Sequence, residues 1–258
     1  MVQQQITLPK TIEVPVRTYT NPDTGAQVTY FGMLHVAQEP FFAEVRDRVT
    51  RLEADGAHVY LEGITSPASD TLGADTDELR WGVGVVKRKL ETMWREGEAL
   101  GLVAQRDALP ARDGWQVHDV TVLEAVQIYG VEALRNQHQD TQREGLLLDH
   151  FDPALTRAMT MQSLALVMKA ATDTAIRDIL FPEHEATLAR VREGKVVAAL
   201  DRQLAAEPDA HIVVVWGAGH LVSYDEALTE RGYKSDDEQW LTAIDVATLP
   251  PLIPQQRA

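Results

Sequence analysis

The sequence predicts an α/β fold with a mixed, largely parallel central sheet and flanking helices. Two short apolar runs, at 27–31 and 212–216, each break into a glycine turn that ends in a histidine and leads into a helical pattern. A third strand-like run, at 58–61, follows the first of these helices. Between the units, apolar residues recur at helical spacing and predict a helical insertion at approximately 75–207, within one domain spanning 1–258.

The first unit is predicted as strand, turn, helix and strand. Its first strand is rich in β-branched and aromatic residues and breaks at Gly32, just before His35. Pro40 suits the first turn of a helix, and Gly56 is a plausible stop. The helix has one apolar stripe made of Phe41, Val45, Val49 and Leu52. The second strand then runs into Glu62 and Gly63.

The middle region is predicted to be mainly helical. One long amphipathic helix before Gly101 carries its apolar residues at steps of four and three: Leu79, Val83, Val86, Leu90 and Met93. Further helices should begin at the capping-box pattern Thr121–Glu124, at Asp152-Pro153, and at about Glu183, the last one running to Ala206. Asp119, just upstream of the capping box, is interpreted as a helix cap, with metal or substrate contact as the alternative.

The second unit repeats the arrangement of the first. The run Ile212–Trp216 is typical of a strand covered on both faces, and it breaks into the turn Gly217-Ala218-Gly219-His220. A short helix around 225–229, a stop at Gly232 and a strand near 241–246 should follow. The first 25 residues and the last ten are expected to form strands or arms at the periphery.

The composition excludes several classes of function. A formal net charge of −15 argues against binding nucleic acid or an anionic membrane, because both need basic patches. The chain has no cysteine, so any metal must be held by His, Asp, Glu or backbone oxygens. With no signal-like N-terminus and no apolar run of membrane length, the protein is expected to be cytoplasmic. Its expected partner is a small-molecule or peptide substrate, and a homo-oligomer is left open.

Three candidate site residues are predicted at the carboxyl ends of strands, where ligands bind in open α/β sheets. They are His35, Glu62 and His220. Two imidazoles and a carboxylate form a common ligand set for a divalent metal, with Mn, Co and Zn not distinguished. Gly32, Gly217 and Gly219 would let the backbone approach a substrate or metal closely. His58 and His211 begin strands at the opposite end, and we predict no site there.

Arg192 lies on the apolar face of the last central helix, in line with Leu188, Val196 and Ala199. A buried guanidinium must be paired, so it either meets a core carboxylate or points into a polar cleft where it holds an anionic group. The alternative is a side chain that snorkels to the surface. Arg177, flanked by Asp173 and Asp178, is interpreted as a surface pair.

These motifs resemble the TraB/PrgY/GumN family, which includes the Tiki proteins and belongs to a wider group with erythromycin esterases and haem-binding ChaN proteins. The similar segments are Tyr30–Val36, Val59–Glu62 and Val214–Leu221, and their order and separation also agree. By distance, Arg192 corresponds to the family's arginine, with Arg177 as the alternative. The resemblance implies one cleft between the two Gly-x-x-His motifs and a metal-dependent, peptidase-like activity.

The residues and the resemblance together predict metal-dependent hydrolysis, most simply of a peptide or other amide bond. His35 and His220 would hold the cation, and Glu62 would ligate it or serve as general base. Arg192 would bind a substrate carboxylate or stabilise developing negative charge. Two alternatives stay open: a metal- or haem-binding protein without turnover, and a metal-independent esterase with a histidine as general base.

Overall fold

The computed structural model describes residues 9–66, 75–138, 153–170, 173, 175–176, 179 and 183–250. Six strands form its main sheet, in the order β6-β4-β7-β2-β1-β8. Their bounds are β1 Thr11–Thr20, β2 Gln27–Met33, β4 His58–Leu61, β6 Gln116–Val117, β7 His211–Gly217 and β8 Lys234–Asp245. A small second sheet pairs β3 (Val36–Ala37) with β5 (Val103–Ala104). The mixed α/β class predicted from the sequence is therefore confirmed.

Strands β2, β7, β4 and β6 are parallel to one another, whereas β1 is antiparallel to both of its neighbours, β2 and β8. The prediction of a peripheral N-terminal segment was wrong for β1. This strand lies between β2 and β8 and buries Ile12, Val14, Val16 and Tyr19. Its side chains pack in both core layers, which excludes a peripheral position.

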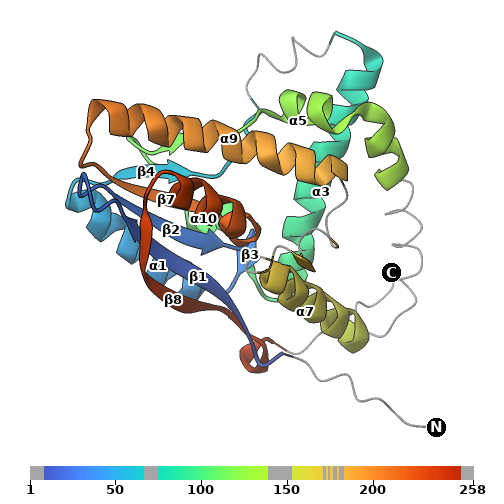
Figure 1. Ribbon diagram of the computed structural model, residues 1–258. Coiled ribbons are helices and arrows are strands. Elements are labelled where there is room, and N and C mark those ends of the chain that lie inside the picture. Colours follow the sequence, from blue (N-terminus) through green and yellow to red (C-terminus); the bar gives the residue numbers. More distant parts are fainter. Residues whose placement is uncertain are drawn as a thin grey trace.

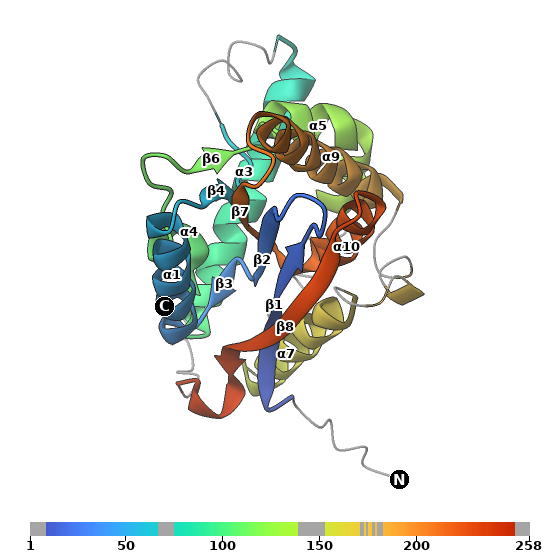
Figure 2. The ribbon, with the colours of Figure 1, turned by 60° about the vertical axis from the view of Figure 1, so that its left-hand side comes forward.

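Helices cover both faces of the sheet (Figures 1 and 2). The helix α1 (Glu39–Ala54) packs on one face through Phe41, Phe42, Val45 and Val49, with Pro40 in its first turn as predicted. The helices α9 (Glu183–Ala206) and α10 (Leu221–Glu230) pack on the other face. Successive residues of β7 alternate between the two layers, Val213 and Val215 on one side and Ile212, Val214 and Trp216 on the other.

The middle region contains α3 (Asp77–Ala99), α4 (Gln105–Ala108), α5 (Val122–Tyr129) and α7 (Pro153–Ala170). The long helix before Gly101 and the capping box of Thr121 with Glu124 are both confirmed. The region is not purely helical, because β6 adds a strand to the edge of the main sheet beside β4. The helix predicted to start at Asp152-Pro153 is confirmed at Pro153, which begins α7, whereas Asp152 lies outside the described residues.

The strand register brings the predicted site residues to one edge of the sheet. Met33 of β2 pairs with Gly217 of β7, and Leu61 of β4 pairs with Val215. The chain therefore leaves β2, β4 and β7 at the same end of the sheet, close to His35, Glu62 and the short 3₁₀ turn Ala218–His220. Among the described residues, no helix combines the length and apolar character needed to cross a membrane.

Candidate functional site

The centre of the site is an ion-pair cluster in which Arg192 bridges two carboxylates. Its Nη2 donates to Glu62 Oε1 at 2.5 Å and to Asp119 Oδ2 at 2.7 Å, and its Nε donates to Asp119 Oδ1 at 2.9 Å. The side chains of Asp119 and Glu62 are only 0% and 3% exposed. Arg192 thus meets core carboxylates, as one branch of the sequence interpretation predicted, and the snorkelling alternative was wrong.

Glu62 is held as a carboxylate by its surroundings. Burial alone would raise its pKa, but the positive charge of Arg192, with further contributions from His35 and His220, outweighs burial and lowers the pKa from 4.5 to about 2. The same pairing raises the pKa of Arg192 against the opposing effect of burial. The second oxygen of Glu62 accepts a 2.5 Å hydrogen bond from the Gly217 amide. Glu62 therefore ties β4, β7 and α9 together.

Asp119 has a role that the sequence interpretation missed. It does not cap α5, because Thr121 is the N-cap and accepts from the Glu124 amide. Instead its carboxylate receives Arg192 and the backbone amides of Gly63 and Val120, at 3.2 and 2.7 Å. The cap interpretation was wrong because Thr121 already supplies the cap, which leaves Asp119 to pair across the sheet edge with α9.

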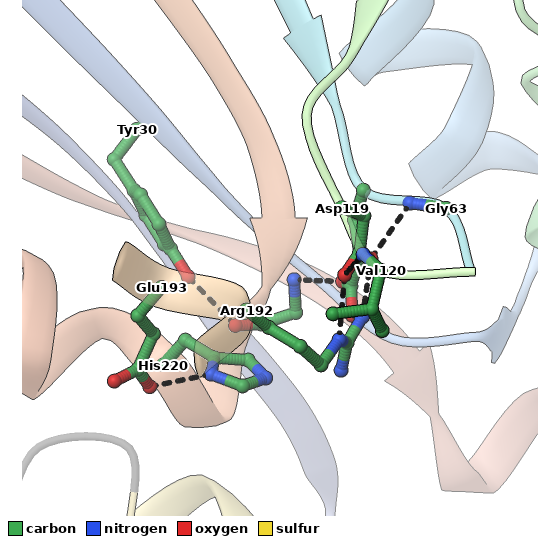
Figure 3. Close-up of polar contacts among 9 residues, drawn as sticks. Tyr30, Gly63, Asp119, Val120, Arg192, Glu193 and His220 are labelled. Atoms are coloured by element: carbon green, nitrogen blue, oxygen red, sulfur yellow. Dashed lines mark hydrogen bonds and ion pairs between the residues drawn. The ribbon is translucent and has the colours of Figure 1, made fainter. Parts of the chain in front are cut away.

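His220 is oriented by Glu193, the residue after Arg192 on α9. The Nδ1 atom of His220 lies 2.6 Å from Glu193 Oε1, and the two side chains are 15% and 12% exposed. Figure 3 shows this pair on one side of Arg192, with Asp119 and Gly63 on the other side. Because Nδ1 faces a carboxylate, the neutral ring carries its proton there and leaves the Nε2 lone pair free. Nothing in the sequence interpretation singled out Glu193.

His35 sits at the same sheet edge but is held differently. Its backbone carbonyl accepts from the Gln105 amide at 2.9 Å, whereas its side chain is exposed and has no hydrogen bond or ion pair within the described part of the chain. The His35 ring is near enough to contribute to the lowered pKa of Glu62. The structure thus brings His35, Glu62, Arg192 and His220 into one neighbourhood, with only His35 unrestrained.

Two of the three predicted glycines are required by close approach. A Cβ atom at Gly32 would lie 2.8 Å from the Pro15 carbonyl oxygen, and one at Gly217 would lie 3.0 Å from Glu62 Oε2. A Cβ at Gly219 would meet no atom within 4 Å. Gly32 and Gly217 therefore let the strand ends and Glu62 pack together. Gly219 leaves the backbone of the turn open to a ligand.

An aromatic layer supports the site from the α10 side. The Tyr30 hydroxyl donates to the Gly217 carbonyl at 2.6 Å, and its ring lies 4.9 Å from the ring of Tyr224. The guanidinium of Arg192 stands 5.6 Å from the centre of the buried Trp216 ring. The Tyr224 hydroxyl is buried without a hydrogen-bond partner among the described residues, and its pKa is raised by burial and by the nearby Tyr30 and site carboxylates. It therefore stays protonated.

The predicted metal ligands are close but do not form a complete site as placed. Within residues 9–66, 75–138 and the later described segments, no three His, Asp or Glu side chains converge closely enough to hold a metal ion. Metal binding by His35, His220 and Glu62 stays a prediction. Arg177, the alternative family arginine, lies outside the described residues.

The opposite end of the sheet provides a contrast. There, His58 pairs with Glu207 at 2.8 Å, and His211 with the hydroxyl of Thr29 at 2.9 Å. Neither histidine contributes to the site, as the sequence predicted.

No protein-family model, curated protein or solved structure matches the chain.

Proposed function

We propose that the protein is a hydrolase of ester or amide bonds, including peptide bonds, in which His220 activates water as a general base. The observation that carries this proposal is the 2.6 Å contact between His220 Nδ1 and Glu193. A carboxylate in this position fixes the imidazole tautomer and stabilises the imidazolium that forms when Nε2 takes a proton. The resemblance of the same turns to the TraB/PrgY/GumN motifs also supports a hydrolase.

Water is the nucleophile in the proposed reaction. His220 Nε2 removes a proton from water as the oxygen attacks the substrate carbonyl carbon, which forms a tetrahedral oxyanion. The carbon–nitrogen or carbon–oxygen bond then breaks, and His220 returns the proton to the leaving group. Glu193 stays ionised throughout and offsets the transient positive charge on the ring.

Two sets of donors would stabilise the oxyanion. Arg192 uses Nε and Nη2 for its carboxylates, and its Nη1 makes no hydrogen bond to the residues that the structure describes. The first amides of a helical segment have no partner within it, and here they are the amides of the 3₁₀ turn Ala218–His220, which continues directly into α10. The open space at Gly219 would let a substrate reach these amides. Arg192 would donate one hydrogen bond from Nη1 to the developing oxyanion. A substrate carboxylate would instead need the charge and the paired donors that Glu62 and Asp119 already take.

A metal-dependent form of the same hydrolysis is the second candidate. The observation that favours it is charge: Glu62 and Asp119 share the single guanidinium of Arg192, and Glu193 faces His220, so two negative charges are uncompensated when both imidazoles are neutral. Uncompensated buried charge is costly, and a divalent cation would offset it. His220, His35 and Glu62 would supply its ligands after His35 turns inward. Such an ion would lower the pKa of bound water and polarise the carbonyl.

The test is hydrolysis of a panel of chromogenic esters and peptide amides by the full chain, with and without chelator, alongside its His220→Ala variant. The proposal expects cleavage that survives chelation and falls by about a thousandfold in the variant. Loss of activity on chelation, with restoration by Mn, Co or Zn, would favour the metal-dependent form. Equal cleavage by both proteins would contradict both forms, and metal content without turnover would favour a binding protein.

We also propose a cytoplasmic location, which is supported by a cysteine-free sequence that needs no oxidising compartment. Fractionation of the cells that produce the protein tests this location.

A further inference from the structure

We propose that the substrate carries a positive charge, such as an ammonium group, close to the bond that is cleaved, and that the site rejects anionic substrates. This inference rests on the proposed hydrolase function and names its substrate class. It reverses the expectation that Arg192 binds a substrate carboxylate.

The first argument is that Arg192 is already neutralised. Asp119 and Glu62 take two of its three guanidinium nitrogens, and both carboxylates are buried. A substrate carboxylate bound at Nη1 would be attracted by the guanidinium but repelled by the carboxylates of Glu62 and Asp119 that bind the same guanidinium. A free guanidinium attracts anions through both charge and paired hydrogen bonds, and here neither is available in full.

The second argument is the position of Glu193. Its Oε1 faces His220, whereas its Oε2 makes no hydrogen bond to the described residues and is not fully buried. The same is true of Arg192 Nη1 and His220 Nε2. These three atoms therefore reach solvent. Nη1 can donate to a carbonyl oxygen, Nε2 can take a proton, and Oε2 can accept from an ammonium group.

The third argument comes from Tyr224, on α10 four residues after His220. Its hydroxyl is fully buried, has no hydrogen-bond partner among the described residues, and interacts electrostatically with Tyr30, Glu62, Glu193 and Asp119. A buried hydroxyl without a partner is unfavourable, and a polar group from outside the chain that reached it would supply the missing hydrogen bond. An added group that lies among three carboxylates is favoured when it donates hydrogen bonds, as ammonium does and a carboxylate cannot.

Electrostatics sets the size of the expected preference. Unit charges roughly 5 Å apart at a partly buried site change binding by about one to two orders of magnitude. The net charge of −15 on the whole chain acts in the same direction at longer range. Salt screens these effects over about 10 Å at 0.1 M ionic strength, so the preference should shrink as salt is added.

The experiment uses three matched chromogenic amides that differ at one position: an ammonium, a neutral isostere and a carboxylate. Both kcat/KM and the binding constant of each compound are measured with the full chain in the presence of chelator. Binding is measured on the His220→Ala protein, in which the expected slow turnover leaves the compound intact during the measurement. Glu193→Gln is the test variant. Glu207→Gln is the matched control, because it removes the same charge from the residue that follows α9, at the opposite sheet end.

The expected result is at least tenfold tighter binding of the ammonium compound than of its neutral isostere, and weaker binding still of the carboxylate. About 0.5 M salt should reduce the preference, Glu193→Gln should reduce it severalfold, and Glu207→Gln should leave it unchanged. Equal binding of the three compounds, or tighter binding of the carboxylate, would overturn the inference. Absence of cleavage with the binding preference intact would instead count against the proposed hydrolase function and leave the charge preference supported.

Discussion

The two Gly-x-x-His turns leave neighbouring parallel strands at one sheet edge, but only one of them carries a preorganised histidine. His220 is held by Glu193 of α9 and is mostly buried, whereas His35 is exposed and its side chain makes no hydrogen bond or ion pair with the described residues. The strands and glycines place the two backbones similarly. The difference comes from α9, which reaches the second turn with Arg192 and Glu193. A motif thus positions a histidine, and the element packed beside it determines its chemistry.

The largest expected effect separates the two histidines by activity. His220→Ala should lower kcat/KM by about a thousandfold, because it removes the general base. His35→Ala should cost about tenfold, because an exposed and unrestrained ring contributes less to a preorganised site. Steady-state kinetics on the best panel substrate measures both. Equal losses would mean that the two turns have equivalent roles.

Removal of Arg192 should produce the largest loss of stability. Arg192→Met leaves Glu62 and Asp119 buried without their cation, which should lower the free energy of unfolding by about 3–5 kcal/mol. Urea unfolding measures the change. The exposed Arg190 on the same helix provides the control, because Arg190→Met should change stability by less than about 0.5 kcal/mol. A small effect of Arg192→Met would show that the cluster is not a stabilising link.

Stability should also depend on pH through Glu62. The pKa of this group falls from 4.5 in the unfolded chain to about 2 in the folded one, so its contribution is complete above about pH 5 and is lost as the pH falls towards 2. The expected size is about 3 kcal/mol. Between about pH 5 and pH 2, the free energy of unfolding should fall less steeply with decreasing pH in Glu62→Gln than in the parent protein. An unchanged slope would argue against the pairing with Arg192.

A smaller effect distinguishes the Glu193 pair from the chemically similar pair at the other sheet end. Glu193→Gln keeps a hydrogen-bond acceptor for His220 but removes its charge, and should lower kcat by about tenfold to a hundredfold with little change in KM. Glu207→Gln changes the partner of His58 in the same way and should leave kcat unaltered. If the two variants have the same kcat, the negative charge of Glu193 beside His220 plays no part in catalysis.

The sequence predicted the elements well because periodicity and turn residues are local. The strand 58–61, the helix 183–206 and the capping box at Thr121 match the structure. The buried pairing of Arg192 was also predictable, since a charged residue on an apolar helix face must find a partner.

The partners themselves depend on long-range packing. Asp119 and Arg192 are 73 residues apart, and a local cap motif concealed the role of Asp119. One local pattern does indicate the position of Glu193: Val196 and Leu200, three and seven residues later, place it on the buried face of α9. The inner position of β1 was missed because pairing with both β2 and β8 leaves no local pattern in the sequence.

The central claim is that Glu193 fixes the proton of His220 on Nδ1 and leaves Nε2 free to act. Nitrogen NMR of the protein labelled at its histidines tests it directly, with His220 assigned from the His220→Gln spectrum. The account predicts that neutral His220 is protonated at Nδ1 and that Glu193→Gln weakens this tautomer preference. A neutral His220 protonated at Nε2 in the parent protein would contradict the account, because that nitrogen would then have no lone pair to accept a proton.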